Sequence, residues 1–124
     1  MTARARKTLA AALLLVSACV VYRVETVDTL YFGTMKADGS SVSDAQWQQF
    51  VTDVIAPRLE GFTTWDADGL YRTQARTVQR ERTHIIQIVH ADARVVADII
   101  AAYKKQFAQE SVLWLRGRAG VAFQ

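Results

Sequence analysis

Residues 83–107, THIIQIVHADARVVADIIAAYKKQF, place a strand pattern directly before a helix pattern. The strand pattern centres on residues 85–89, a β-rich run with apolar residues on both sides, as is typical of a central strand. Asp92 can cap the following helix. Apolar side chains then recur at helical spacing, at Val96, Ile99, Ile100, Tyr103 and Phe107. We therefore predict a buried strand over about residues 78–90 and an amphipathic helix after it.

The preceding residues predict a hairpin and an earlier helix. A strand over about 61–72 and a turn at 73–76 would form a long hairpin with the central strand. Asp68-Gly69 is either a bulge in that hairpin or its turn. Ser43 and Gln46 form a capping box, and Pro57 closes the helix after it. The apolar face of this helix consists of Trp47, Phe50, Val51, Val54 and Ile55.

Two further strands complete the pattern, over residues 28–35 and 111–115, and Gly117 and Gly120 would loosen the chain beyond the second of them. The resulting order, β-α-β-β-α-β, is the ferredoxin-like α+β arrangement. It predicts an antiparallel sheet with both helices on one face and with the first and third strands in the centre.

The N-terminus predicts export. Residues 1–18 combine three cations (Arg4, Arg6, Lys7), an apolar run, and small residues ending at Ala18, which is the layout of a signal peptide. Even when it is extended through residue 22, the apolar run covers only 14 residues. A spanning helix needs about 20 residues.

The sole cysteine lies at the expected cleavage point. Val16-Ser17-Ala18-Cys19 resembles the lipobox of bacterial lipoproteins, which implies cleavage after Ala18 and acylation of Cys19. Two or three acyl chains would anchor the protein stably in a membrane. Val20 lacks the Asp that retains such lipoproteins in the inner membrane, so the resemblance allows sorting to the outer membrane. The alternatives are a plain exported protein and a retained anchor. We expect a tether over 19–27 and a single domain over 28–124.

Net charge argues against nucleic-acid binding. The whole chain has 15 basic and 12 acidic residues, a net charge of +3. Residues 1–18 contain three basic residues and no acidic ones, so the remaining 106 residues carry 12 of each sign. The basic character belongs to the signal, and the exported domain lacks the electrostatic footprint of a nucleic-acid binder.

No sequence motif identifies a catalytic, cofactor or metal site. The chain contains no GxSxG, P-loop, HExxH or GxGxxG sequence. His84 and His90 are six residues apart on one predicted strand, roughly 20 Å, which is too far to share a metal ion. We therefore predict no catalytic residue, cofactor or metal.

Two groups of residues are candidates for binding. The candidate polar site comprises Arg58, Arg80, Glu81 and Glu110. In it, Glu110 could neutralise Arg58, Arg80 or Arg82. The arginines near the hairpin could also bind an anion or form a solvated tip.

The candidate face is the open side of the sheet. We expect Leu30, Phe32, Ile86, Ile88, Leu113 and Leu115 to face the helices. The outward set would be Tyr31, Trp65, Ile85, Gln87, Val89, Val112 and Trp114, with Tyr31, Trp65, Gln87 and Trp114 as the candidate contact residues. Such a face is too apolar to be fully solvated. A partner subunit, a ligand or the chain's own tail would cover it.

Several strings together resemble the uncharacterised bacterial family DUF3574, a domain of unknown function. They are residues 28–33, Trp47 with Phe50 and Arg58, Arg80-Glu81, Tyr103-Lys104, and Phe107 with residues 109–113. The resemblance implies a small exported protein and assigns no activity.

Two functions remain. One is a lipid-anchored binding module, with a homodimer or an apolar partner on the open face. The other is a small enzyme resembling dimeric α/β-barrel oxygenases and isomerases, with Tyr31, Arg80, Glu81 and Glu110 as its polar groups.

Overall fold

The computed structural model describes residues 19–72 and 75–124. The predicted signal, with its cleavage residue Ala18, and residues 73–74 lie outside this part of the chain. The elements are β1 (Arg23–Gly33), α1 (Asp44–Phe50), the π-helical turn η1 (Val51–Ile55), the 3-10 turn η2 (Ala56–Arg58), β2 (Thr63–Arg72), β3 (Val78–Val89), α2 (Ala93–Phe107) and β4 (Leu113–Val121).

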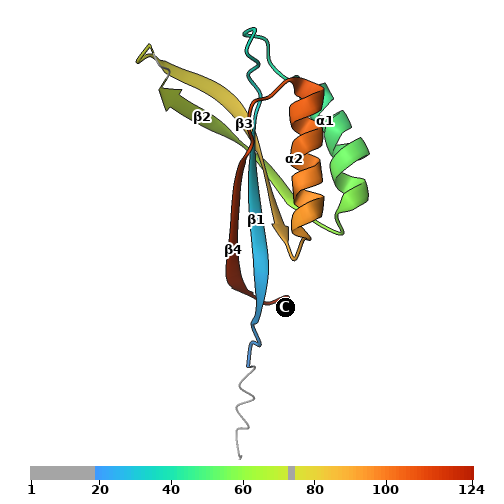
Figure 1. Ribbon diagram of the computed structural model, residues 1–124. Coiled ribbons are helices and arrows are strands. Elements are labelled where there is room, and N and C mark those ends of the chain that lie inside the picture. Colours follow the sequence, from blue (N-terminus) through green and yellow to red (C-terminus); the bar gives the residue numbers. More distant parts are fainter. Residues whose placement is uncertain (1–18, 73–74) are drawn as a thin grey trace, which may run out of the picture.

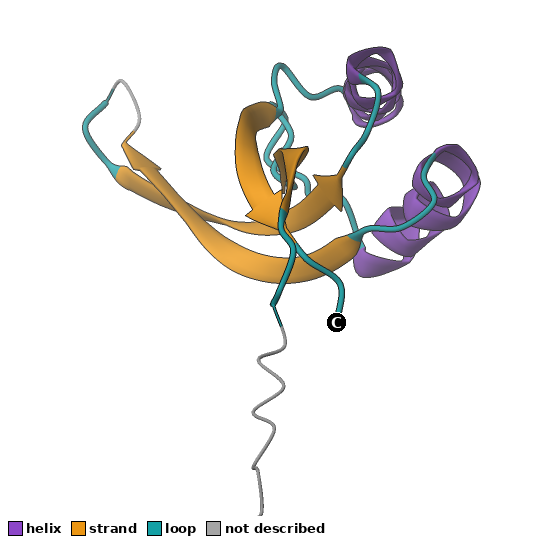
Figure 2. Ribbon diagram, turned by 90° about the horizontal axis from the view of Figure 1, so that it is seen from below, coloured by secondary structure: helices purple, strands orange, loops and turns teal. Residues whose placement is uncertain are grey.

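The strands form one antiparallel sheet in the order β2-β3-β1-β4. Both helices lie on the same side of it, and the β2–β3 hairpin extends beyond them (Figures 1 and 2). This arrangement confirms the predicted ferredoxin-like α+β fold, with β1 and β3 in the centre. No helix in the described ranges is long and apolar enough to cross a membrane.

Both predicted helix starts are confirmed by their caps. The Ser43 hydroxyl accepts a hydrogen bond from the Gln46 amide at 3.1 Å, and the Gln46 side chain accepts one from the Ser43 amide at 2.9 Å. The Asp92 carboxylate accepts a hydrogen bond from the Arg94 amide at 2.7 Å. The first helix continues through η1 and η2, so Pro57 lies in its last turn and Arg58 is its final residue.

The two outer ends of the sheet are longer than predicted. β1 begins at Arg23, so the second half of the expected 19–27 tether is strand. β4 continues to Val121, through Gly117 and Gly120, which were expected to loosen the chain. These extensions pair with each other, from Arg23↔Val121 to Asp28↔Arg116. Each extension supplies the backbone hydrogen-bond partners of the other. The side chains of either segment do not reveal this pairing.

The β2–β3 hairpin is long, as predicted, and its register is continuous through Asp68-Gly69. Asp68 pairs with Arg82 and Gly69 pairs with Glu81. The dipeptide is therefore neither a bulge nor the turn.

Aromatic rings fill the space between the sheet and the helices. Phe32, Trp47, Phe50, Tyr103 and Phe107 form a connected cluster, with neighbouring ring centroids 4.8–6.4 Å apart. All five are at most 3% exposed. The predicted apolar faces of both helices thus supply much of the core, because burying aromatic area is a large favourable term in folding.

A buried ion pair fastens β4 to the core. Asp28 is fully buried, and its carboxylate accepts hydrogen bonds from Trp114 Nε1 at 2.6 Å and Arg116 Nε at 2.9 Å. Arg116 also donates to the second Asp28 oxygen at 3.2 Å and to the Ala91 carbonyl at 2.8 Å. These contacts satisfy the carboxylate, as a buried charge requires.

Candidate ligand and partner face

The strand register divides the side chains between the two faces of the sheet. Leu30 and Phe32 on β1, and Ile86 and Ile88 on β3, are buried on the helix side, as predicted. Paired residues share a face and neighbours along a strand alternate. The outward positions near the centre are Val27, Thr29, Tyr31 and Gly33; Thr83, Ile85, Gln87 and Val89; Thr63, Trp65 and Ala67; and Leu113, Leu115 and Gly117.

Three of the four residues predicted for the open face lie on its outward side. Tyr31, Trp65 and Gln87 face outward, whereas Trp114 pairs with Leu30 and faces the helices, so its assignment was wrong. The register likewise turns Leu113 and Leu115 outward, where they are 55% and 50% exposed. Val112 also packs against the core instead of facing outward. Because residues 112–115 are all apolar, hydropathy could not specify which face each residue occupies.

Five side chains make the open face apolar, and we call them the outer row: Tyr31, Trp65, Ile85, Leu113 and Leu115. Trp65 is 42% exposed, whereas Ile85 is buried at 4%. None of the fourteen outward positions near the sheet centre carries a charge. Trp65, Leu113 and Leu115 thus expose apolar area around the buried Ile85, and such a strip is of the kind that marks contact surfaces.

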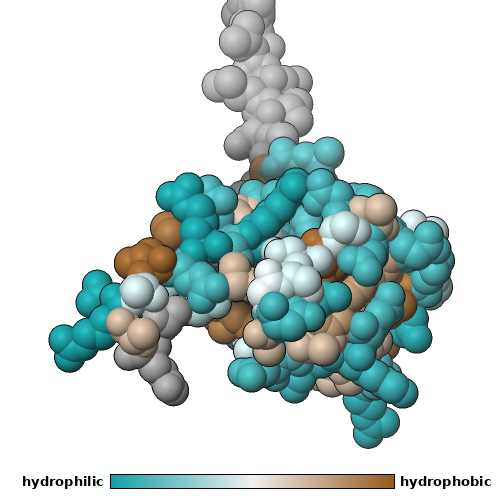
Figure 3. Space-filling model, turned by 90° about the horizontal axis from the view of Figure 1, so that it is seen from above, coloured by the Kyte–Doolittle hydropathy of each residue, from teal (hydrophilic) through white to brown (hydrophobic). Residues whose placement is uncertain are grey.

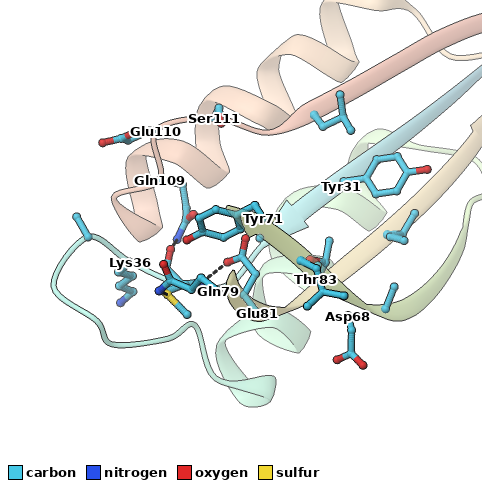
Figure 4. A pocket seen from close by; sticks show the side chains of 18 of the residues that line it. Tyr31, Lys36, Asp68, Tyr71, Gln79, Glu81, Thr83, Gln109, Glu110 and Ser111 are labelled. Carbon is cyan, nitrogen blue, oxygen red and sulfur yellow. Dashed lines mark hydrogen bonds between the residues drawn. The ribbon is translucent and has the colours of Figure 1, made fainter. Parts of the chain in front are cut away.

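A pocket of about 840 Å³ adjoins the hairpin end of the outer row. Its lining comes from all four strands, from the loop after β1, and from the segment between α2 and β4. The polar lining side chains are Tyr31, Lys36, Asp68, Tyr71, Gln79, Glu81, Thr83, Gln109, Glu110 and Ser111 (Figure 4). Its size is within the range of small-molecule sites.

Glu81 holds the loop that forms one wall of this pocket. Its Oε2 accepts a hydrogen bond from the Met35 amide at 2.8 Å, and Gln109 Nε2 donates to the Met35 carbonyl at 3.1 Å (Figure 4). Gln79 also contacts the Met35 sulfur. The hydroxyl of Thr34 donates to the Arg82 carbonyl at 2.7 Å. The loop is therefore held both by β3 and by the segment after α2.

The buried Tyr103 lies beneath the same corner. Its hydroxyl donates to the Gly33 carbonyl at 2.8 Å. Burial raises the pKa of this phenol well above its usual value, and the negative charge of Glu81 raises it further. Tyr103 therefore stays protonated and acts as a hydrogen-bond donor that fixes the end of β1.

The surface around the hairpin end is mostly hydrophilic. Seen from that end, polar side chains predominate and apolar ones gather on the hairpin arm (Figure 3). Leu70 and Val78, which lie on that arm, are 59% and 66% exposed.

Comparison with known proteins identifies the family. The model described as "Protein of unknown function (DUF3574)" matches residues 27–123. The chain belongs to the DUF3574 family. No curated protein gives a significant match.

Solved structures share the fold of this DUF3574 domain at low identity. A phage SAM lyase in complex with S-methyl-5'-thioadenosine matches with a TM-score of 0.54 and 16% identity, over 80% of this chain and 90% of that chain. A phage SAM lyase in the apo state gives 0.56 and 18%, over 82% and 86%. CutA from Synechococcus elongatus PCC7942 gives 0.53 and 12%, over 83% and 84%. At these identities the likeness concerns the fold.

The predicted polar site of the DUF3574 domain is not assembled. Arg58 donates to the Val54 carbonyl at 2.7 Å, within its own helix. Arg80 lies on the helix-side face of β3, 3.8 Å from Asp68. Glu81 and Glu110 both line the pocket, yet neither pairs with an arginine in the described part of the chain. Arg80 and Glu81 are neighbours on β3 and therefore face opposite sides of the sheet.

Sequence reasoning missed a second polar cluster, on the helix-side face. His84 Nδ1 lies 2.6 Å from Asp66 Oδ1, and Arg82 bridges Asp66 and Asp44. Hydrogen bonds from Arg82 and His84 lower the pKa of Asp66. His84 stacks on Trp47 at 4.4 Å, and its buried Nε2 has no hydrogen-bond partner among the described residues. The adjacent aromatic stack makes this histidine part of the core.

The other histidine of the DUF3574 domain is exposed. His90 Nδ1 lies 2.7 Å from Glu25 at the end of β3. Within residues 19–72 and 75–124, no group of three or more His, Cys, Asp or Glu side chains could hold a metal ion.

Proposed function

We propose that this DUF3574 protein is an exported, lipid-anchored binding module whose open sheet face packs against a second copy of the chain. The observation that carries the proposal is the outer row, an apolar strip without charge on a sheet face that no described element covers. Two helices cover the opposite face (Figure 2).

A second copy is the occupant that this chemistry favours. In a two-fold dimer the same patch contacts itself, so a charged patch would repel its copy unless the charges were offset. The outward neighbours of the outer row near the sheet centre, among them Thr29, Thr83 and Gln87, are uncharged, so self-association through these positions would bury no unpaired charge. Trp65 and Tyr31 are the residue types that most often anchor interfaces.

The position of Cys19 is consistent with a lipid anchor. Its side chain is exposed, and it lies four residues before β1. In Figure 1 the start of β1 and the C-terminus lie at one end of the sheet, opposite the hairpin and the loop after β1. An acylated Cys19 would therefore leave the pocket end away from the bilayer.

The enzyme alternative has less support from the geometry. Tyr31, Glu81 and Glu110 line the pocket, but Arg80 lies on the other face of β3. The four proposed polar groups therefore do not converge on one point, as a catalytic constellation requires.

Acylation is tested by mass spectrometry of the protein isolated from the cell envelope. We expect a mature N-terminus at Cys19 carrying a diacylglyceryl group, and we expect Cys19→Ser to leave the membrane fraction. An unmodified Cys19, or cleavage elsewhere, would contradict the anchor.

Self-association is tested by analytical ultracentrifugation of residues 19–124 carrying Cys19→Ser. This chain contains every described helix and strand, all between Arg23 and Val121. We expect a dimer at micromolar concentration, and we expect Leu115→Glu to shift it to a monomer, because each copy would bury an unpaired carboxylate in the interface. Val78→Glu is the matched control, since Val78 is exposed but outside the outer row. A wild-type monomer at several hundred micromolar would rule out the dimer.

A further inference from the structure

The pocket contains a hollow where the sheet lacks side chains. Successive outward positions along β3 are Gln79, Glu81, Thr83 and Ile85. On β2, Gln79 pairs with Tyr71 and Glu81 pairs with Gly69. Thr83 lies between Ala67 on β2 and Gly33 on β1, and Ile85 lies between Trp65 on β2 and Tyr31 on β1. Only glycine and alanine therefore lie beside Glu81 and Thr83 on the neighbouring strands. Tyr71 and Tyr31 lie at the two ends of this stretch.

Two glycines keep polar atoms in the hollow accessible. A Cβ on Gly33 would come within 2.8 Å of Glu81 Oε1, and one on Gly69 within 2.7 Å of Thr83 Oγ1. Both distances are shorter than real contacts allow. The glycines therefore leave room for these two oxygen atoms, and any larger residue at either position would push them aside.

These oxygen atoms have unused hydrogen-bonding capacity. Thr83 is only 7% exposed, and its hydroxyl makes no hydrogen bond with any described residue. Glu81 uses Oε2 for the Met35 amide, while its Oε1 accepts no hydrogen bond from the described residues. Among the described residues, His84 Nε2 is the only buried side-chain nitrogen or oxygen atom without a partner, so both oxygen atoms reach the open space of the pocket. A donor from outside the chain would supply the missing bonds.

The charge of the lining favours a cation. Three carboxylates line the pocket (Asp68, Glu81 and Glu110), and Lys36 is the single cation among its lining residues. The charge of Asp68 is offset by Arg80, 3.8 Å away, which leaves Glu81 as the negative charge within the hollow. In Figure 4 Glu81 and Thr83 lie between the two tyrosines, while Glu110 points away from them. Aromatic faces attract organic cations as well as apolar groups.

We propose that this pocket binds a small organic ammonium ion that carries an apolar body. Its N–H groups donate to Glu81 Oε1 and Thr83 Oγ1, and its body lies along Tyr31 or Tyr71. The proposal rests on the binding role of the open face. The pocket shares Tyr31, Ile85 and Leu113 with the outer row, but a single chain forms it, so it does not require dimerisation.

The test is isothermal titration of the Cys19→Ser chain, residues 19–124, with 2-phenylethylamine as the probe. The neutral analogue 2-phenylethanol has the same body without the charge. We expect the amine to bind about 10-fold or more tightly than the alcohol, since hydrogen bonds to charged groups contribute more than neutral ones. Equal affinities for the two probes would overturn the proposal.

Variants test whether Glu81 and Thr83 cause the preference for the amine. Glu81→Gln can still accept the Met35 amide, but it removes the charge, so its affinity for the amine should fall about 10-fold, to that for the alcohol. Thr83→Val removes the second acceptor at nearly constant volume and should lower the affinity for the amine several-fold. Glu60→Gln, an exposed carboxylate outside the lining, should change nothing. Unchanged amine affinity in a folded Glu81→Gln protein would overturn the proposal.

The same titration separates this proposal from the dimer. Leu115 is absent from the pocket lining, so Leu115→Glu should abolish dimerisation and keep amine binding. Amine binding by a monomeric wild-type chain would support the pocket while rejecting the dimer. A dimeric chain that binds the amine and the alcohol equally would support the dimer and reject the pocket proposal.

Discussion

Replacing Asp28 with Ala is expected to lower the free energy of unfolding by about 3 kcal/mol, at the lower end of the effects seen when a buried ion pair loses one partner. Asp28 is fully buried and accepts hydrogen bonds from Trp114 Nε1 and Arg116. The substitution would leave the Trp114 indole donor without its partner and a partly buried guanidinium unpaired. Urea denaturation monitored by tryptophan fluorescence measures this loss.

Two control variants show whether the loss of stability in Asp28→Ala comes from the ion pair. Asp98→Ala removes an exposed carboxylate from α2 and should change stability by no more than about 0.5 kcal/mol. Adding Arg116→Ala to Asp28→Ala should recover part of the loss, because no unpaired charge then remains. A loss below about 1 kcal/mol for Asp28→Ala would mean that Arg116 reaches water easily and that the buried pair contributes little.

Trp47→Ala should be at least as damaging, with an expected loss of about 3–5 kcal/mol. Trp47 is 2% exposed, and its ring contacts Phe32 at 5.2 Å and stacks on His84 at 4.4 Å. Removing it would open a cavity between α1 and the sheet and would expose His84 without its aromatic cover. The same urea denaturation, monitored by far-ultraviolet circular dichroism, measures the effect.

The matched control for Trp47 is Phe123→Ala. Phe123 is 91% exposed near the C-terminus, so the expected change is within about 0.5 kcal/mol. A Trp47→Ala protein of nearly wild-type stability would show that the aromatic cluster repacks around the gap, contrary to its close-packed geometry.

Local signals in the sequence were sufficient for the element order and for the core of each helix. Ser43 with Gln46 and Asp92 specify helix starts through bonds made within a few residues. The helical spacing of Val96, Ile99, Tyr103 and Phe107 predicted the four buried side chains of α2. Such signals depend on local geometry, so they are readable before the fold is known.

Strand ends and strand faces were harder to predict, because they depend on a distant partner. The first half of β1 and the last half of β4 are strands because they pair with each other across about ninety residues of chain. Trp114 faces the helices because it pairs with Leu30 and donates to Asp28. In an all-apolar segment a shift of one residue exchanges the faces without changing the hydropathy pattern.

The candidate site shows the same division. The sequence by itself determined that the chain would form a ferredoxin-like sheet with an apolar open face, because alternation and spacing are local properties. It also named Tyr31, Trp65 and Glu81 as candidates, and all three lie on the outward face of the sheet. Only the tertiary structure decided that Gly33 and Gly69, forty-eight and fourteen residues away from their contacts, leave open the space around Glu81 and Thr83. A hollow is made by missing side chains on separate strands, so it exists only once the register brings those strands together.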